Sequence, residues 1–193
     1  MNNRSVAALG YALFAFLLSV VPNVSSAQTT LVAAPARPPT PVPVEYPDFA
    51  PMRFLVGTWT CSQPWRGGTR TETNVYTIAS DRMWIDDAVT SPAFDQYRTS
   101  VRNGTMRMTY DAEIGQWVAI YDDNLGSYAI ESTPGWQGNV ASWSGTGLDG
   151  RTYSDVITKV SDTETNDVYA STSQGKTTNV TITCKKSTPL AQR

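Results

Sequence analysis

The chain of 193 residues contains no histidine. Without an imidazole there is no Ser-His-Asp or Cys-His nucleophile, no histidine-ligated zinc site and no side chain that shuttles protons near neutral pH. Catalysis would have to use Asp, Glu, Tyr, Lys or Arg, and a buried carboxylate or a Tyr/Arg pair can move protons. The composition therefore excludes histidine-dependent chemistry and leaves acid–base chemistry by other groups open.

Clusters of positive charge are also missing. The sequence has 15 Lys and Arg against 17 Asp and Glu, with a formal net charge of −2, and its basic residues are scattered singly. Proteins that bind nucleic acid or anionic membranes carry grouped Lys and Arg side chains. We therefore expect neither nucleic acid nor an anionic membrane surface as a partner.

The N-terminal segment has the three parts of a secretory signal peptide. Arg4 supplies a positive n-region, residues 6–21 an uncharged and mostly apolar h-region, and residues 25–27 a small-residue cleavage site. The apolar run is too short for an integral membrane anchor. We expect a signal peptide over residues 1–27, cleavage before Gln28, and a periplasmic or secreted protein.

The rest of the chain divides by composition. Residues 28–47 contain six prolines and little that could build a core, which favours an extended tether. Residues 48–187 are long enough to bury a core as one domain. Residues 188–193 form a short tail.

The domain reads as strands and turns throughout. Short runs of alternating apolar and polar residues are separated by Gly, Asn, Asp and Pro. The pairs Asn103-Gly104, Asp149-Gly150 and Gln174-Gly175 predict hairpin turns. The expected strands cover residues 54–63, 70–79, 82–90, 94–102, 105–111, 116–122, 127–133, 138–146, 151–160, 166–172 and 177–185.

Helical signals are confined to one short segment. A turn over residues 48–54 has Asp48 as its N-cap and Pro51 in its first turn. The sequence therefore predicts an all-β fold, a single antiparallel up-and-down barrel of about ten strands with a short N-terminal helical cap. An open sandwich is the main alternative.

The two cysteines, Cys61 and Cys184, lie at opposite ends of the domain. Cys61 shares a strand face with Trp59, and Cys184 shares a face with Ile182. In a closed barrel the first and last strands are neighbours, so both thiols would meet on apolar faces. In an exported protein this pairing favours a disulfide; two buried free thiols are the alternative.

The motif Gly57-Thr58-Trp59 after a capping turn, with Trp117 and Trp143 on later strands, resembles the calycins: lipocalins, fatty-acid-binding proteins and nitrobindin-like barrels. The lipocalin-like domains of exported bacterial proteins are the most similar. The resemblance implies a central cavity for an apolar or amphipathic ligand. It also implies that Trp59 plugs the closed end while Gly57 allows a close approach.

Cofactors and metals are not expected. Nitrobindin-like relatives hold haem iron through a histidine, which this chain lacks. The pairs Asp86-Asp87 and Asp122-Asp123 cannot converge on one ion, because neighbouring strand residues face opposite ways. Asp86 shares a face with Trp84; if that face is inward, burial would raise the pKa of Asp86.

Aromatic and Met side chains are the candidate ligand contacts. Met106, Met108 and Tyr110 alternate with polar residues, so one face of their strand is apolar, and Tyr and Trp suit an amphipathic ligand. The alternative is that these side chains fill the core and leave no cavity. The predicted ligand-binding residues are Trp84, Tyr97, Met106, Met108, Tyr110, Trp143 and Tyr153.

Three functions remain open from the sequence. The first is a barrel that binds a small apolar or amphipathic molecule. The second is an enzyme on the same barrel, using a carboxylate such as Asp86 or Asp155 beside Tyr or Arg. The third is an envelope interaction module without a ligand, which predicts a packed interior and an exposed apolar patch.

Overall fold

The computed structural model describes residues 46–65, 68–94 and 98–187. The predicted signal peptide (1–27), nearly all of the predicted tether (28–47), the predicted tail (188–193) and Tyr97 lie outside the described residues. Within those described ranges, no helix is long and apolar enough to cross a bilayer.

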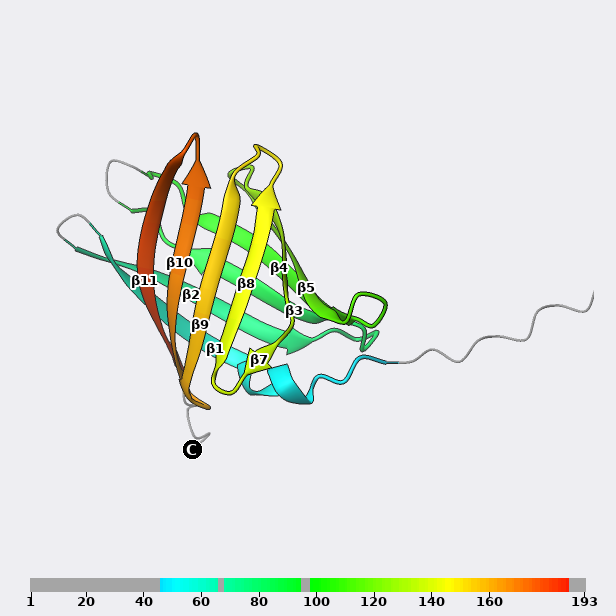
Figure 1. The fold of residues 1–193 in the computed structure, drawn as a ribbon. Coiled ribbons are helices and arrows are strands. Elements are labelled where there is room, and N and C mark those ends of the chain that lie inside the picture. The colour runs from blue at the N-terminus through cyan, green and yellow to red at the C-terminus, as the bar shows by residue number, and fades with distance from the viewer. Residues whose placement is uncertain (1–45, 66–67, 95–97, 188–193) are drawn as a thin grey trace, which may run out of the picture. The chain divides into compact units, whose positions relative to one another are not determined.

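Antiparallel strands dominate the described chain, and ten of them close into a barrel (Figure 1). Strands adjacent in sequence pair with each other except β6 and β7; β1 pairs with β11, and both β6 and the two-residue strand β7 pair with β8. The predicted all-β, closed up-and-down barrel is therefore confirmed. The strands are β1 Gly57–Trp65, β2 Gly68–Ile78, β3 Ile85–Ser91, β4 Arg102–Asp111, β5 Gln116–Asp123, β6 Tyr128–Thr133, β7 Trp136–Gln137, β8 Val140–Gly147, β9 Thr152–Ser161, β10 Glu164–Ser173 and β11 Lys176–Lys186.

Closure places the two cysteines opposite each other. Cys61 on β1 is the register partner of Cys184 on β11, and their sulfurs form a disulfide. Both residues are buried beside Trp59. The disulfide predicted from strand parity is confirmed.

One end of the barrel is covered by a short 3-10 helix, η1 (Ala50–Leu55), the cyan coil below the strands in Figure 1. Asp48 Oδ1 accepts a hydrogen bond from Ala50 N at 2.9 Å, and a proline occupies the first turn of the helix. Met52 is the buried residue of η1 and packs into the larger core cluster. The predicted helical cap is therefore a single 3-10 element.

One predicted strand and one predicted turn are wrong. Of the strand predicted at residues 94–102, residues 94 and 98–101 belong to no named strand, and Phe94 and Arg98 form an isolated bridge; residues 95–97 lie outside the described residues. Asn103 and Gly104 lie inside β4 rather than in a hairpin turn. The Tyr121 hydroxyl would lie 2.7 Å from a Cβ at Gly104, so this glycine makes room for a ring from β5. The turns at Gly150 and Gly175 are confirmed, and both glycines have positive φ.

Candidate ligand-binding cavity

The barrel encloses a cavity of about 410 Å³. Side chains from each of the strands β1 to β11 line it, together with Met52 and Leu55 of η1. Its volume falls within the range of about 300–1,000 Å³ typical of small-molecule sites. Because η1 covers one end, we call the opposite end, where β2, β4 and β9 begin, the mouth.

Trp59 closes the cavity at the η1 end. It is 2 % exposed, and its Nε1 donates a hydrogen bond to Leu55 O at 2.6 Å. The Lys186 ammonium lies 5.6 Å from the centroid of the Trp59 ring and donates to Phe54 O at 2.7 Å. Lys186 therefore ties the last strand to the cap through the tryptophan, a role that the sequence analysis did not assign.

The Lys186 side chain occupies the space that a Cβ at residue 57 would need, so a glycine is needed there. Its φ is +129°, and a Cβ there would lie 2.8 Å from Lys186 Cε. A side chain at this position would be strained by the backbone conformation as well as crowded. The close approach that the sequence predicts at Gly57 is therefore an approach of a side chain from β11.

Four of the predicted ligand-binding residues line the cavity. Met106, Met108, Trp143 and Tyr153 all contribute to its wall. Met108 and Trp143 also belong to the buried core, and Tyr153 stacks on Tyr169 with ring centroids 6.0 Å apart. Their contact with a ligand stays a prediction, and Tyr97 lies outside the described residues.

Trp84 and Tyr110 do not line the cavity, contrary to expectation. The core face of β3 begins at Ile85, so Trp84 has the opposite parity and lies 4.9 Å from the outward Arg107 guanidinium. Tyr110 has the inward parity of β4, but it lies at the η1 end of the strand, past the cavity. There it is 39 % exposed and packs edge-on against Trp117.

Besides Glu72 at the mouth, four carboxylates line the cavity, one each from β3, β6, β9 and β10. Burial raises the pKa of Asp87 to about 7, that of Asp155 to about 8 and that of Asp167 to about 6. Burial also raises the pKa of Glu131. Nearby Asp167 and Glu131 add to the rise at Asp155 by like-charge repulsion.

Asp87, not Asp86, is the inward acid of β3. Asp86 is half-exposed and pairs with Arg107 at 2.7 Å on the outer surface. Asp87 is 2 % exposed and lies between the cavity-facing Ile85 and Val89 in the alternation of the strand. The parity of those two β-branched residues is the sequence signal that identifies Asp87 as inward, whereas the parity of Trp84 points to Asp86.

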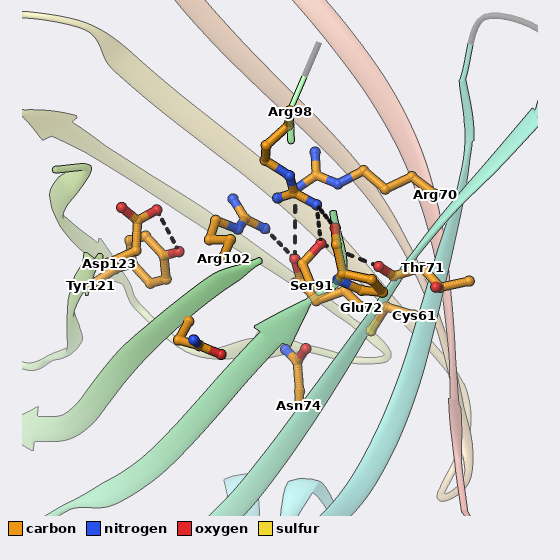
Figure 2. A network of polar contacts seen from close by, with 12 residues as sticks. Cys61, Arg70, Thr71, Glu72, Asn74, Ser91, Arg98, Arg102, Tyr121 and Asp123 are labelled. Atoms are coloured by element: carbon orange, nitrogen blue, oxygen red, sulfur yellow. Dashed lines mark hydrogen bonds and ion pairs between the residues drawn. The ribbon is translucent and has the colours of Figure 1, made fainter. Parts of the chain in front are cut away.

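Positive charge gathers at the mouth. Figure 2 shows the guanidinium groups of Arg70, Arg98 and Arg102 around Glu72 and Ser91. Arg102 pairs with Glu72, Arg70 lies 3.8 Å from the same carboxylate, and Arg98 donates to Ser91 Oγ at 2.8 Å. Arg70 and Arg102 thus share the one carboxylate of Glu72, while Arg98 has no ion pair in the described chain.

The excess of positive charge at the mouth affects the pKa values of its arginines. Burial, and then the charge of Arg102, lowers the pKa of both Arg70 and Arg98. Glu131, Asp155 and Asp167 take no part in the ion pairs of the described chain, and nor does Asp87. Across the described residues, no three acidic or cysteine side chains are grouped closely enough to hold a metal ion.

No family model matches this chain, and no curated protein matches it either. The chain is similar to the solved structure of EF1p2_mFAP2b bound to DFHBI, with 11 % sequence identity and a TM-score of 0.41. That similarity covers 70 % of this chain and 96 % of the other. Because identity and TM-score are this low, we transfer no residue role or ligand from it. Fold and cavity define a closed antiparallel barrel with an internal site.

Proposed function

We propose that this chain is an exported lipocalin-like barrel of the calycin type that binds one small amphipathic molecule in its cavity. The cavity of about 410 Å³ carries the proposal, because a barrel filled by its own side chains would leave no such space. Met106 and Trp143 supply apolar surface, while Asp155 supplies a polar group. Such a wall suits a molecule with an apolar body and a polar end.

The proposed assignment to the calycins is supported by the structure of the closed end of the barrel, next to η1. The motif of Gly57 and Trp59 follows a short 3-10 helix, and a basic side chain from the last strand covers the tryptophan. The resemblance implies only that Trp59 plugs this end and that Gly57 allows a close approach; the lysine over Trp59 is an addition from the structure. The barrel order, with β1 beside β11, agrees with the resemblance.

A matched pair of variants on β6 tests the binding site. Ala129 is buried and lines the cavity, whereas its neighbour Ile130 is 45 % exposed on the outer face. Ala129→Phe should fill the mouth side of the cavity and weaken binding of the neutral fluorescent probe N-pentyl dansylamide at least tenfold. Ile130→Phe should leave binding within twofold of the wild type. Equal binding by both folded variants would place the site elsewhere.

Native mass spectrometry supplies the ligand itself. The protein, purified from its own compartment without detergent, should carry a co-purifying small molecule that the Ala129→Phe variant lacks. A bare chain mass in the wild type, together with no binding of the pentyl probe, would argue against the proposed function.

Export is proposed from the N-terminal segment and the disulfide. Oxidised Cys61 and Cys184 are typical of exported proteins. We propose the signal peptide at residues 1–27, the tether at 28–47, the barrel at 48–187 and the tail at 188–193. The intact mass of the protein from cells should correspond to a chain that starts at Gln28; an uncleaved mass would contradict export by this route.

A second candidate function is favoured by Asp155. This carboxyl, whose pKa burial raises to about 8, lies directly across the strand pair from Tyr169. A carboxyl that titrates near neutral pH can accept or donate a proton, as the acid–base alternative requires. The co-purified molecule should then return chemically altered after incubation with wild-type protein, and unaltered after incubation with Asp155→Asn. The packed interior expected for a ligand-free module is not found, because the cavity is present.

A further inference from the structure

The four carboxylates of the cavity have no basic neighbours across the strands. Each lies between two neutral residues of the adjoining strands. Those neighbours are Tyr76 and Met106 for Asp87, Ala119 and Gly145 for Glu131, Trp143 and Tyr169 for Asp155, and Ile157 and Ile182 for Asp167. The sheet itself therefore provides no counter-charge for these four groups.

Three of the four also have one carboxylate oxygen that accepts no hydrogen bond. Asp87 Oδ2 accepts from Asn74 Nδ2 at 3.2 Å, but Asp87 Oδ1 has no partner in the described chain. The same is true of Oδ1 of Asp155 and of Asp167. Asp167 Oδ2 lies 3.7 Å from Cys184 Sγ, a disulfide sulfur that has no proton to donate. Buried carboxylates without donors destabilise the empty protein.

We propose that the molecule bound by this barrel carries a protonated amine, which lies among Asp87, Asp155 and Asp167. The inference rests on the ligand-binding function proposed above and names the class of ligand. An ammonium group has three donors and no acceptor, so it can supply both the charge and the hydrogen bonds that these side chains lack. Beyond the effect of burial, Asp167 is near enough to Asp155 to raise its pKa, and Asp87 and Asp167 both raise the pKa of Tyr76.

The arginine side chains at the mouth need hydrogen-bond acceptors, whereas the carboxylates inside need donors. The buried Nε atoms of Arg98, Arg102 and Arg151 have no acceptor in the described chain. Cationic side chains at the mouth disfavour a ligand whose outer end is also cationic. We therefore expect the amine to enter first and a neutral or acceptor-rich end to remain beside the arginines.

Strand geometry gives the reach that such a ligand needs. Asp87 and Ser91 are both inward residues of β3, and Ser91 pairs in register with Arg102 at the mouth. Four residues of a strand span about 13 Å at ~3.3 Å per residue. An amine and an outer polar group separated by a short alkyl spacer can therefore reach both ends of the cavity.

Three fluorescent probes test this with the mature protein. Dansylcadaverine, N-pentyl dansylamide and N-dansyl-6-aminohexanoic acid share the dansyl group and a five-carbon chain, which ends in ammonium, hydrogen or carboxylate respectively. At pH 7.5 and fixed ionic strength, dansylcadaverine should bind at least tenfold tighter than the pentyl probe, and the carboxylate probe should bind weakest. This ranking requires no variant and so does not depend on any mutant folding.

Variants that remove one negative charge test which carboxylates bind the amine. Asp155→Asn and Asp167→Asn each keep the side-chain shape and should weaken dansylcadaverine at least fivefold more than they weaken the pentyl probe. Asp86→Asn, on the outer face, should change neither. The melting temperature of each variant establishes that it is folded.

The outcomes separate this inference from the proposed function. If the pentyl probe binds as tightly as dansylcadaverine, or the carboxylate probe binds tightest, the amine inference is overturned while ligand binding stands. If the ranking holds but Asp155→Asn and Asp167→Asn lose nothing, the amine is not held by these carboxylates and the inference is overturned. If no probe binds and no molecule co-purifies, both fail together.

Discussion

At the scale of single residues, the closed end of the barrel depends on one contact between distant parts of the sequence. Lys186 reaches across Trp59 to a carbonyl of η1, and Gly57 leaves the space that the lysine stem occupies. The motif of Gly57 and Trp59 is local, but its reason lies at the other end of the domain. A glycine here is therefore part of the closure of the barrel and not simply a flexible point.

Replacing Gly57 by Ala should destabilise the protein. Its φ of +129° is strained for any residue with a Cβ, and the new methyl would meet Lys186 Cε at 2.8 Å. We expect a loss of about 1–3 kcal/mol in the free energy of unfolding, measured by urea denaturation. Gly68→Ala is the matched control, since nothing lies within 4 Å of its Cβ position and its φ is not positive. Equal stability of the two variants would contradict this account of Gly57.

At the scale of elements, the barrel has two short seams. The β1–β11 pairing has four register pairs and the β6–β8 pairing also has four, whereas β1–β2 has nine. The disulfide crosses the first of these seams, at Cys61 and Cys184. It therefore joins two strands that have few backbone hydrogen bonds to hold them and that are 123 residues apart in sequence.

Reducing this disulfide should lower the melting temperature strongly. A bridge that closes a loop of this length contributes about 5 kcal/mol in the chain-entropy model, a large part of the stability of a domain. We expect a fall of more than ten degrees when the melt is repeated with a thiol reductant.

The Cys61→Ser/Cys184→Ser double variant is the control for that experiment. It should melt near the temperature of the reduced wild type and show no further change when reductant is added. A wild-type melt that is unaffected by complete reduction, verified by alkylation of both thiols, would contradict a stabilising role for the bridge.

At the scale of the whole molecule, the barrel separates charge along its axis. Carboxylates without counter-ions lie inside, and the guanidiniums of Arg70, Arg98 and Arg102 gather at the mouth (Figure 2). Because burial raises the pKa values of Asp87, Asp155 and Asp167, the folded state binds more protons than the unfolded state above the ordinary pKa of 3.8. By linkage, these groups make the free energy of unfolding fall as pH rises.

The empty protein should therefore become less stable between pH 5 and pH 8, with the loss ending above the pKa of Asp155, about 8. Each titrating group contributes a slope of at most about 1.4 kcal/mol per pH unit. Thermal melts at half-unit intervals of pH measure it. Asp155→Asn should flatten the upper part of the profile and raise stability at pH 8. A wild-type melting temperature that rises from pH 5 to pH 8 would contradict this reading of the cavity.

Much of the architecture could be predicted from the sequence because it depends on local patterns. Strand alternation and turns such as Asp149-Gly150 act over a few residues, and they predict an all-β chain of about ten strands. The hairpin predicted at Asn103-Gly104 failed for a tertiary reason. The glycine is needed inside β4, where the Tyr121 ring takes the space of a side chain.

The residues that line the cavity were harder to predict, because the register of each strand decides which of its side chains point into the barrel. Assigning the inward face of one strand from Trp84 gave the wrong parity, while Ile85 and Val89 would have given the right one. Met106 and Met108 were placed correctly because their alternation with polar residues is unbroken along β4. Tyr110 has the inward parity of β4 but does not line the cavity, because its position along the barrel axis places it beyond the end of the cavity.

By itself the sequence determined the strand content, the order of the strands and, through the parity of Cys61 and Cys184, how the barrel closes. These properties follow from the two-residue repeat of a strand and from chain connectivity. Only the tertiary structure decided that four carboxylates share one cavity and that Lys186 covers Trp59. Those side chains come from strands far apart in sequence, and the register and curvature of the closed sheet bring them together.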